Sequence, residues 1–184
     1  PDVAGHPIHP DHGDDTGGAC GAMLADPAGF LEGESPYSSN GGFVIKDLPQ
    51  AKNAIDWYAE HGYPQLKIYN SFPKAILKDT VSYAHSRGMR VSGHVPAGLR
   101  AQDALDAGYD EIQHINQVML NFLVTPTTET RTLERFILPS EKVADLDFNS
   151  AAMNKFVATL KAKQTVIDPT LATFAFLKQR DGDL

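Results

Sequence analysis

The 184-residue sequence contains a single cysteine, Cys20, and no long uninterrupted apolar segment. One cysteine cannot form a disulfide within the chain, so the fold has to be stable without that cross-link. No apolar run approaches the roughly 20 residues that are needed to span a bilayer, and the N-terminus shows no charged segment followed by an apolar signal core. We therefore expect no membrane partner.

Basic residues are also scarce. Lys and Arg total 16 against 23 Asp and Glu, which gives a net charge of −7, and no basic stripe is interleaved with aromatic residues. This balance predicts no nucleic-acid partner. Neither a G-x-G-x-x-G pattern nor a Walker pattern occurs, so a dinucleotide or phosphate loop is not expected. The hydrophobic share of 42% is sufficient for one sizeable core.

What the sequence does contain is an alternation of strand-like and helix-like segments. Residues 1–42, rich in Gly, Pro, His and Asp, are interpreted as loop with a strand remnant at the very start. Turn and capping residues bound the segments that follow. The expected elements are a helix from Asp47 to His61-Gly62, a strand at 65–70, a helix at 71–88, a strand at 89–95, a helix at 97–107, a strand at 109–115, a helix through Met153, Phe156, Val157 and Leu160, and a strand at 165–167.

Alternating strands and amphipathic helices predict an α/β fold with a parallel sheet and right-handed crossovers. Because no Gly-rich phosphate loop is present, we favour a (β/α)₈ TIM barrel over a doubly wound sheet. Only about four βα units are recognisable, whereas a whole barrel takes roughly 250 residues, so residues 1–184 are expected to form a single incomplete barrel domain. Residues 117–149, interrupted by Pro126 and Pro139, are interpreted as an insertion or lid with one short helix.

Three polar residues stand where expected strands end: Lys67, His94 and His114. The carboxyl ends of parallel strands are where α/β folds place their chemistry, so these side chains are expected to converge. Neutral imidazole is a strong ligand for zinc and related divalent metals. A desolvated lysine has a lowered pKa, and its free amine can take up carbon dioxide to give an anionic carbamate that could bridge two metals.

Two other interpretations of these residues stay open. Buried polar side chains need partners in any fold, so the three residues could be structural members of a non-catalytic α/β scaffold or interaction module. Lys67 could alternatively be the Schiff-base nucleophile of a different barrel enzyme, such as an aldolase. Convergence on one accessible pocket would distinguish an active site from a scaffold.

Residues 66–121 resemble the amidohydrolase superfamily, most closely its imidazolonepropionase-like and prolidase-like branches, and 166–171 resemble the seventh-strand segment of those enzymes. The individual motifs are short, but their order and spacing are fairly specific. The motifs are Lys67-Ile68, Ala84-His85, Gly93-His94, Ala107-Gly108, Ile112-Gln113-His114 and the Val-Ile-Asp-Pro-Thr-Leu run at 166–171.

This resemblance implies a chain that covers about strands 3 to 7 of a metal-dependent hydrolase. Lys67 would be the bridging ligand on the fourth strand, and His94 and His114 would be ligands on the fifth and sixth, for one or two divalent ions, with zinc expected. In that family a metal-activated hydroxide attacks an amide, peptide-like or cyclic amide C–N bond. The first-strand His-x-His pair and the eighth-strand aspartate that shuttles the proton are absent, so no catalytic residue is assigned and the isolated chain is expected to be inactive.

Further residues are candidates for substrate contacts. Tyr69 and Asn70 follow Lys67 on the same strand end and could hydrogen-bond a small-molecule or short peptide-like substrate. His6, His9 and His12 are spaced by three, which does not supply the missing pair, but His12 could line the mouth of the site as a substrate-binding residue. An incomplete barrel exposes strand edges, so the expected partner is the remainder of the barrel or a second copy of the chain.

Overall fold

Parallel strands alternate with helices throughout the part of the chain that the computed structural model describes, residues 28–34 and 41–173. The strands are β1 (Ala28–Glu32), β2 (Phe43–Val44), β3 (Gln65–Ile68), β4 (Arg90–Gly93), β5 (Glu111–Gln113) and β6 (Val166–Asp168). The helices are α1 (Leu48–Glu60), η2 (Lys74–Ile76), α2 (Leu77–Ser86), α3 (Ala101–Ala107), α4 (Ile115–Leu123), α5 (Glu134–Lys142), η3 (Val143–Asp145) and α6 (Ala151–Lys163).

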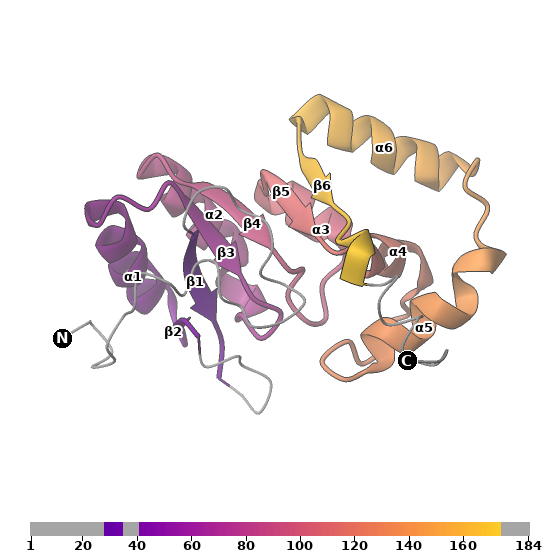
Figure 1. The fold of residues 1–184 in the computed structure, drawn as a ribbon, viewed down its shortest axis with the longest axis horizontal. Helices are drawn as coiled ribbons and strands as arrows, with labels where there is room; N and C mark the ends of the chain where they lie inside the picture. Colours follow the sequence, from indigo (N-terminus) through magenta and orange to yellow (C-terminus); the bar gives the residue numbers. More distant parts are fainter. Residues whose placement is uncertain (1–27, 35–40, 174–184) are drawn as a thin grey trace.

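The strands form two parallel sheets that lie next to each other. The first has the order β2-β1-β3-β4, and the second pairs β5 with β6. Asp110 joins the two sheets: its backbone N–H donates to the Val91 carbonyl at 3.0 Å, and its carboxylate accepts the Val91 N–H at 2.8 Å. Figure 1 shows the resulting row of strands, from β1 in indigo to β6 in yellow. The architecture is therefore an α/β fold resembling part of a barrel, as the sequence predicts.

The two faces of the first sheet differ in polarity because side chains alternate along each strand. Leu66 and Ile68 of β3 and Val91 of β4 lie in the buried apolar core together with residues of α1, α2 and α3. The opposite face contains Lys67, and the paired positions beside it are Phe30 and Ser92. One face thus holds the helices, and the other holds buried polar groups.

Helix boundaries follow the capping residues in the sequence. The Asp47 carboxylate accepts the Gln50 N–H at 2.9 Å and opens α1, which ends before Gly62 with φ at +81°. Gly108 ends α3 with φ at +103°, a conformation that glycine adopts without a steric penalty. These boundaries confirm the helix beginning after Asp47 and the expected stop at Gly108.

A strand inside 1–42 is a correction to the loop interpretation of that segment. β1 lies at Ala28–Glu32 and pairs with both β2 and β3. Its Gly29 has no side chain, and a Cβ there would lie 2.4 Å from the ring of Tyr58, so the glycine marks a close approach of helix α1 to the strand. The Gly, Pro, His and Asp content of 1–42 predicts a loop, whereas this glycine permits close packing of a strand.

The segment at 117–149 contains more helix than expected. Helix α4 covers its beginning, and α5 and η3 follow, where the sequence predicts one short helix. Pro139 lies inside α5 and cannot donate the usual hydrogen bond to the carbonyl of Arg135. The side-chain amide of Asn116 donates to that carbonyl instead, at 3.1 Å, so α4 compensates for the proline. Within the described residues, no helix is long and apolar enough to cross a bilayer.

Candidate functional site

The Lys67 side chain is almost completely buried, with 1% of its surface exposed. It extends from the middle of β3 on the polar face of the sheet, and its Nζ lies 5.4 Å from the centroid of the Phe30 ring. The paired residue on β4 is Ser92, whose hydroxyl donates to the Leu66 carbonyl at 3.2 Å. A lysine is seldom fully buried unless it has a partner, and Lys67 makes interactions beyond these two neighbours.

His94 follows β4 directly, and its position depends on the glycine before it. Gly93 has φ at +123°, and a Cβ there would lie 2.3 Å from the Ile68 carbonyl oxygen, so no other residue fits. The backbone N–H of His94 donates to the same Ile68 carbonyl at 2.8 Å, which fixes the strand end. The imidazole, with the residue 4% exposed, lies 4.5 Å from the Tyr69 ring, centroid to centroid.

His114 follows β5 with a strained backbone, since its φ is +69°. Such values in non-glycine residues persist where surrounding contacts enforce them. The His114 N–H donates to the Asp168 carbonyl at 2.7 Å, and Nδ1 lies 2.9 Å from the Thr170 hydroxyl. His114 is 6% exposed, and its Nε2 is buried without a hydrogen-bond partner among the described residues.

The imidazoles of His94 and His114 lie together, with ring centroids 4.5 Å apart. Burial is the main reason that the pKa of His94 lies well below its ordinary range, and His114, Lys67 and Arg135 lower it further. Burial also lowers the pKa of His114 to about 4, with smaller contributions from Lys67 and Arg135. Both imidazoles are therefore neutral at physiological pH, which is the form that binds metals.

Two charged residues near these strand ends escaped the sequence analysis. Arg135, on α5, lies close enough to affect both histidines, and its Nε is buried without a partner in the described part of the chain. Glu32 ends β1 as a fully buried carboxylate, and one of its oxygens accepts the Gly42 N–H at 3.3 Å. No motif marks Arg135, and Glu32 was hidden by the loop interpretation of its segment.

Across 28–34 and 41–173, no three His, Cys, Asp or Glu side chains come together in a group that could hold a metal ion. The convergent set contains only two imidazoles, and its third member is a lysine, which binds a cation only after losing its proton or forming a carbamate. The described residues thus present an incomplete donor set. This agrees with the absence of the first-strand His-x-His pair from the sequence.

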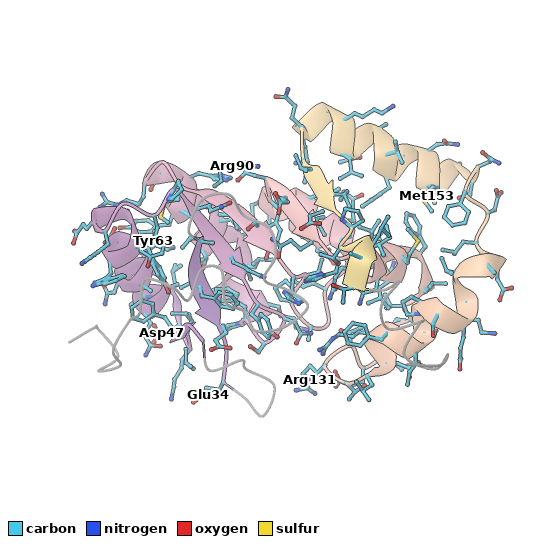
Figure 2. All side chains as sticks on the ribbon, in the orientation of Figure 1. Glu34, Asp47, Tyr63, Arg90, Arg131 and Met153 are labelled. Atoms are coloured by element: carbon cyan, nitrogen blue, oxygen red, sulfur yellow. The ribbon has the colours of Figure 1, made fainter. Side chains whose placement is uncertain are left out.

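A cavity of about 430 Å³ opens at the loops that follow the strands, and Lys67, His94 and His114 are not among the residues that line it. Asn70 and Ser71 line it after β3, and Ala97 and Gly98 line it after β4. Figure 2 shows Glu34 and Arg131, which also line it, at the lower edge of the molecule, opposite Arg90 at the start of β4. The cavity therefore lies at the carboxyl ends of the strands, where α/β folds bind ligands.

The other candidates from the sequence have different outcomes. Tyr69 contacts His94 and lies at the site, but its role in substrate binding stays a prediction. His12 falls outside the described residues. The Asp168 carboxylate accepts the Thr170 N–H at 3.1 Å and so caps the following turn. His85 lies 2.9 Å from a carboxylate oxygen of Asp110 on the outer surface, away from the polar face.

The chain was compared with known families, curated proteins and solved structures. No family model and no curated protein matches it. Among solved structures, it is similar to "AH, Bottromycin amidohydrolase", with a TM-score of 0.50 and 18% sequence identity over 64% of this chain. The match spans 25% of the length of that solved chain. At this identity the likeness concerns the fold alone.

Proposed function

We propose that this chain forms part of the active site of a metal-dependent hydrolase that cleaves a C–N bond in an amide, peptide-like or cyclic amide substrate. Lys67, His94 and His114 are the proposed ligands of one or two divalent ions, with zinc favoured. The observation that supports this most is the convergence of two neutral imidazoles, 4.5 Å apart, from the ends of consecutive strands. The fold likeness to an amidohydrolase agrees with it.

The residues present fit a divalent metal in part. His114 offers a buried Nε2 with no partner in the described part of the chain, while Nδ1 is oriented by Thr170, the arrangement in which a metal-binding imidazole is usually held. An unsatisfied buried nitrogen costs roughly 1–3 kcal/mol, and a bound cation would remove that cost. A bound divalent metal would supply Lewis-acid polarisation of a carbonyl and a lower pKa for an attacking water.

A carbamate on Lys67 would suit a divalent metal better than an ammonium would. Arg135 already places one positive charge near both imidazoles, and an ammonium on Lys67 would add a second. A divalent cation would be repelled by both charges. Carbamate formation changes the side chain from positive to negative, so that Lys67 would attract the metal while Arg135 stays available for an anionic part of the substrate.

The roles of the chain's own residues follow from this assignment. His94 and His114 would hold the metal through neutral imidazoles, and Lys67 as a carbamate would supply a negative ligand. Tyr69, whose ring packs on His94, is the proposed hydrogen-bond partner of the substrate. No described residue takes the part of the proton-shuttling acid, so we expect the chain alone to hydrolyse amides no faster than its variants that lack a ligand.

Metal analysis tests this proposal directly. The full parent protein should hold about one or more equivalents of tightly bound divalent metal, and Lys67→Ala or His94→Ala should lose both metal and hydrolysis. The variant His61→Ala is a matched control, since its exposed imidazole lies on α1 and contacts Trp57. Less than about one equivalent of metal, with activity unchanged in the ligand variants, would contradict the proposal.

The burial of all three side chains favours a second candidate, a non-catalytic scaffold in which they are structural. In that case His94→Ala would destabilise the fold, because it leaves a cavity, yet zinc would not stabilise the unmodified chain. Thermal unfolding with and without zinc separates the two candidates. A zinc-dependent rise in the unfolding temperature that disappears in His114→Ala argues against the scaffold.

A further inference from the structure

The cavity at the strand ends is closed on one side by the loop between α4 and α5. Thr130 holds this loop in place: its hydroxyl accepts the Gly98 N–H at 3.0 Å, and its carbonyl accepts from the Asn70 side-chain amide at 3.3 Å. Thr130 is buried as a result. The loop is therefore fixed to the segments that follow both β3 and β4, and the cavity is a built feature of the fold.

Asn70 lines this cavity and carries an unused acceptor. The residue is 2% exposed, and its Oδ1 has no hydrogen-bond partner among the described residues. The orientation of the amide is set by chemistry, because the Thr130 carbonyl can only accept and so the nitrogen must face it. A buried acceptor of this kind calls for a donor, and the N–H of a bound ligand would supply it.

Lys74 gives the cavity one uncompensated positive charge. Arg131 is held by Glu129 at 2.6 Å, and the lowered pKa of Glu129, about 2, keeps that carboxylate ionised. Glu34 is bound by Lys46, also at 2.6 Å. Lys74 makes no ion pair or hydrogen bond within the described residues, so an anionic ligand group would find a cation there.

The ammonium of Lys74 is also positioned by the backbone. Gly98 has φ at +78°, and a Cβ on it would lie 3.1 Å from the Lys74 Nζ. The missing side chain lets the ammonium lie against the loop after β4, on the cavity wall. Glycine is favoured here by its backbone angle.

We infer that this cavity is a binding subsite for the carboxylate end of an N-acylated amino acid or a peptide-like substrate. The carboxylate would bind Lys74, and the adjacent amide N–H would donate to Asn70 Oδ1. Asn70 stands three residues after Lys67, so their Cα atoms are at most about 10 Å apart, a distance that two or three amino-acid units can span. This inference rests on the proposed function for the identity of the bond that is cleaved, but the binding it describes needs no metal.

Direct binding to the metal-free chain tests the inference separately from hydrolysis. The probes are N-acetylglycine, which has both groups, and N-acetylglycinamide, which keeps the amide but lacks the charge. Chemical shift changes in the Asn70 side-chain amide and the Gly98 backbone amide report on the cavity. We expect saturable binding of N-acetylglycine at millimolar concentrations, and at least about tenfold weaker binding of N-acetylglycinamide.

Variants assign the contacts. Lys74→Met should weaken N-acetylglycine binding about tenfold and leave N-acetylglycinamide unchanged, while Lys78→Met, an exposed lysine on α2, should alter neither. Asn70→Ala should weaken both ligands, with circular dichroism to verify that it folds. Equal binding of the two ligands to the unmodified chain, no saturable binding of N-acetylglycine, or equal effects of Lys74→Met and Lys78→Met would overturn the inference, whether or not the chain binds zinc.

Discussion

The imidazole rings of His94 and His114 lie in contact, with centroids 4.5 Å apart and planes inclined at 57°, although twenty residues separate them in the sequence. Each follows a strand, β4 and β5, and the Asp110 carboxylate and backbone connect those strands. The rings thus meet at the ends of two neighbouring strands that belong to separate sheets and are linked through Asp110. It also means that protonation of one ring disfavours protonation of the other.

The first prediction concerns acid stability of the metal-free chain. The pKa of His114 is about 4 in the fold, against the ordinary value of 6.5 expected in the unfolded chain. Between these values the unfolded chain binds more protons, so the free energy of unfolding should fall as the pH drops from 6.5 to 4, by about 3 kcal/mol from this residue. Urea unfolding of the unmodified chain and of His114→Gln measures it. A pH dependence that His114→Gln leaves unchanged would show that another group is responsible.

A second prediction isolates the charge on Arg135. Because this guanidinium lowers the pKa of His114, Arg135→Gln should raise that pKa in the metal-free chain. Arg131→Gln is the matched control, since Arg131 is bound by Glu129 and does not contribute to the His114 shift. Nuclear magnetic resonance titration of the imidazole gives the values. Equal pKa values in Arg135→Gln and the unmodified chain would place Arg135 too far away to act.

The third prediction tests the junction between the two sheets. Asp110→Ala removes the acceptor of the Val91 N–H and the partner of His85, so the free energy of unfolding should fall by roughly 2 kcal/mol. His85→Ala removes only the exposed half of this arrangement and should cost less than about 1 kcal/mol. Chemical denaturation of both variants decides the matter. Similar costs for the two would mean that the bond to Val91 contributes little.

A fourth prediction addresses the close approach of α1 to β1. Gly29→Ala puts a methyl group against the Tyr58 ring and should destabilise the fold by about 1–3 kcal/mol. Replacing the ring in Gly29→Ala/Tyr58→Leu should recover part of that loss. Thermal unfolding of the single and double variants is the measurement. Additive losses in the double variant would contradict steric contact as the cause.

Much of the fold could be predicted because local signals and tertiary contacts agree. The Asp47 cap and Gly62 mark α1 from either side, and His94 and His114 directly follow β4 and β5, as expected, whereas Lys67 lies within β3. These residues have roles that depend on neighbours within a few positions. Such short-range interactions can be predicted from a sequence without a structure.

The remainder depended on partners far along the chain. Helix α5 tolerates Pro139 because Asn116, on another helix, satisfies the Arg135 carbonyl. The strand at Gly29 could be predicted only by knowing that Tyr58 packs on it. Arg135 and the cavity at Asn70 likewise arise where separate loops meet. The periodicity of one segment does not indicate such contacts with distant segments.

The central proposal is that Lys67, His94 and His114 together bind a divalent ion at one site. Zinc titration of the isotopically labelled chain in bicarbonate, followed by nuclear magnetic resonance of the imidazole nitrogens and of the Lys67 side chain, tests it most directly. The account predicts that one nitrogen on each histidine shifts with the same zinc dependence, that a carbamate carbon appears, and that Lys67→Met weakens zinc binding by 10-fold or more, on the order of the loss typical for a ligand contact. Unchanged imidazole signals at saturating zinc, or equal zinc affinity in Lys67→Met, would contradict it.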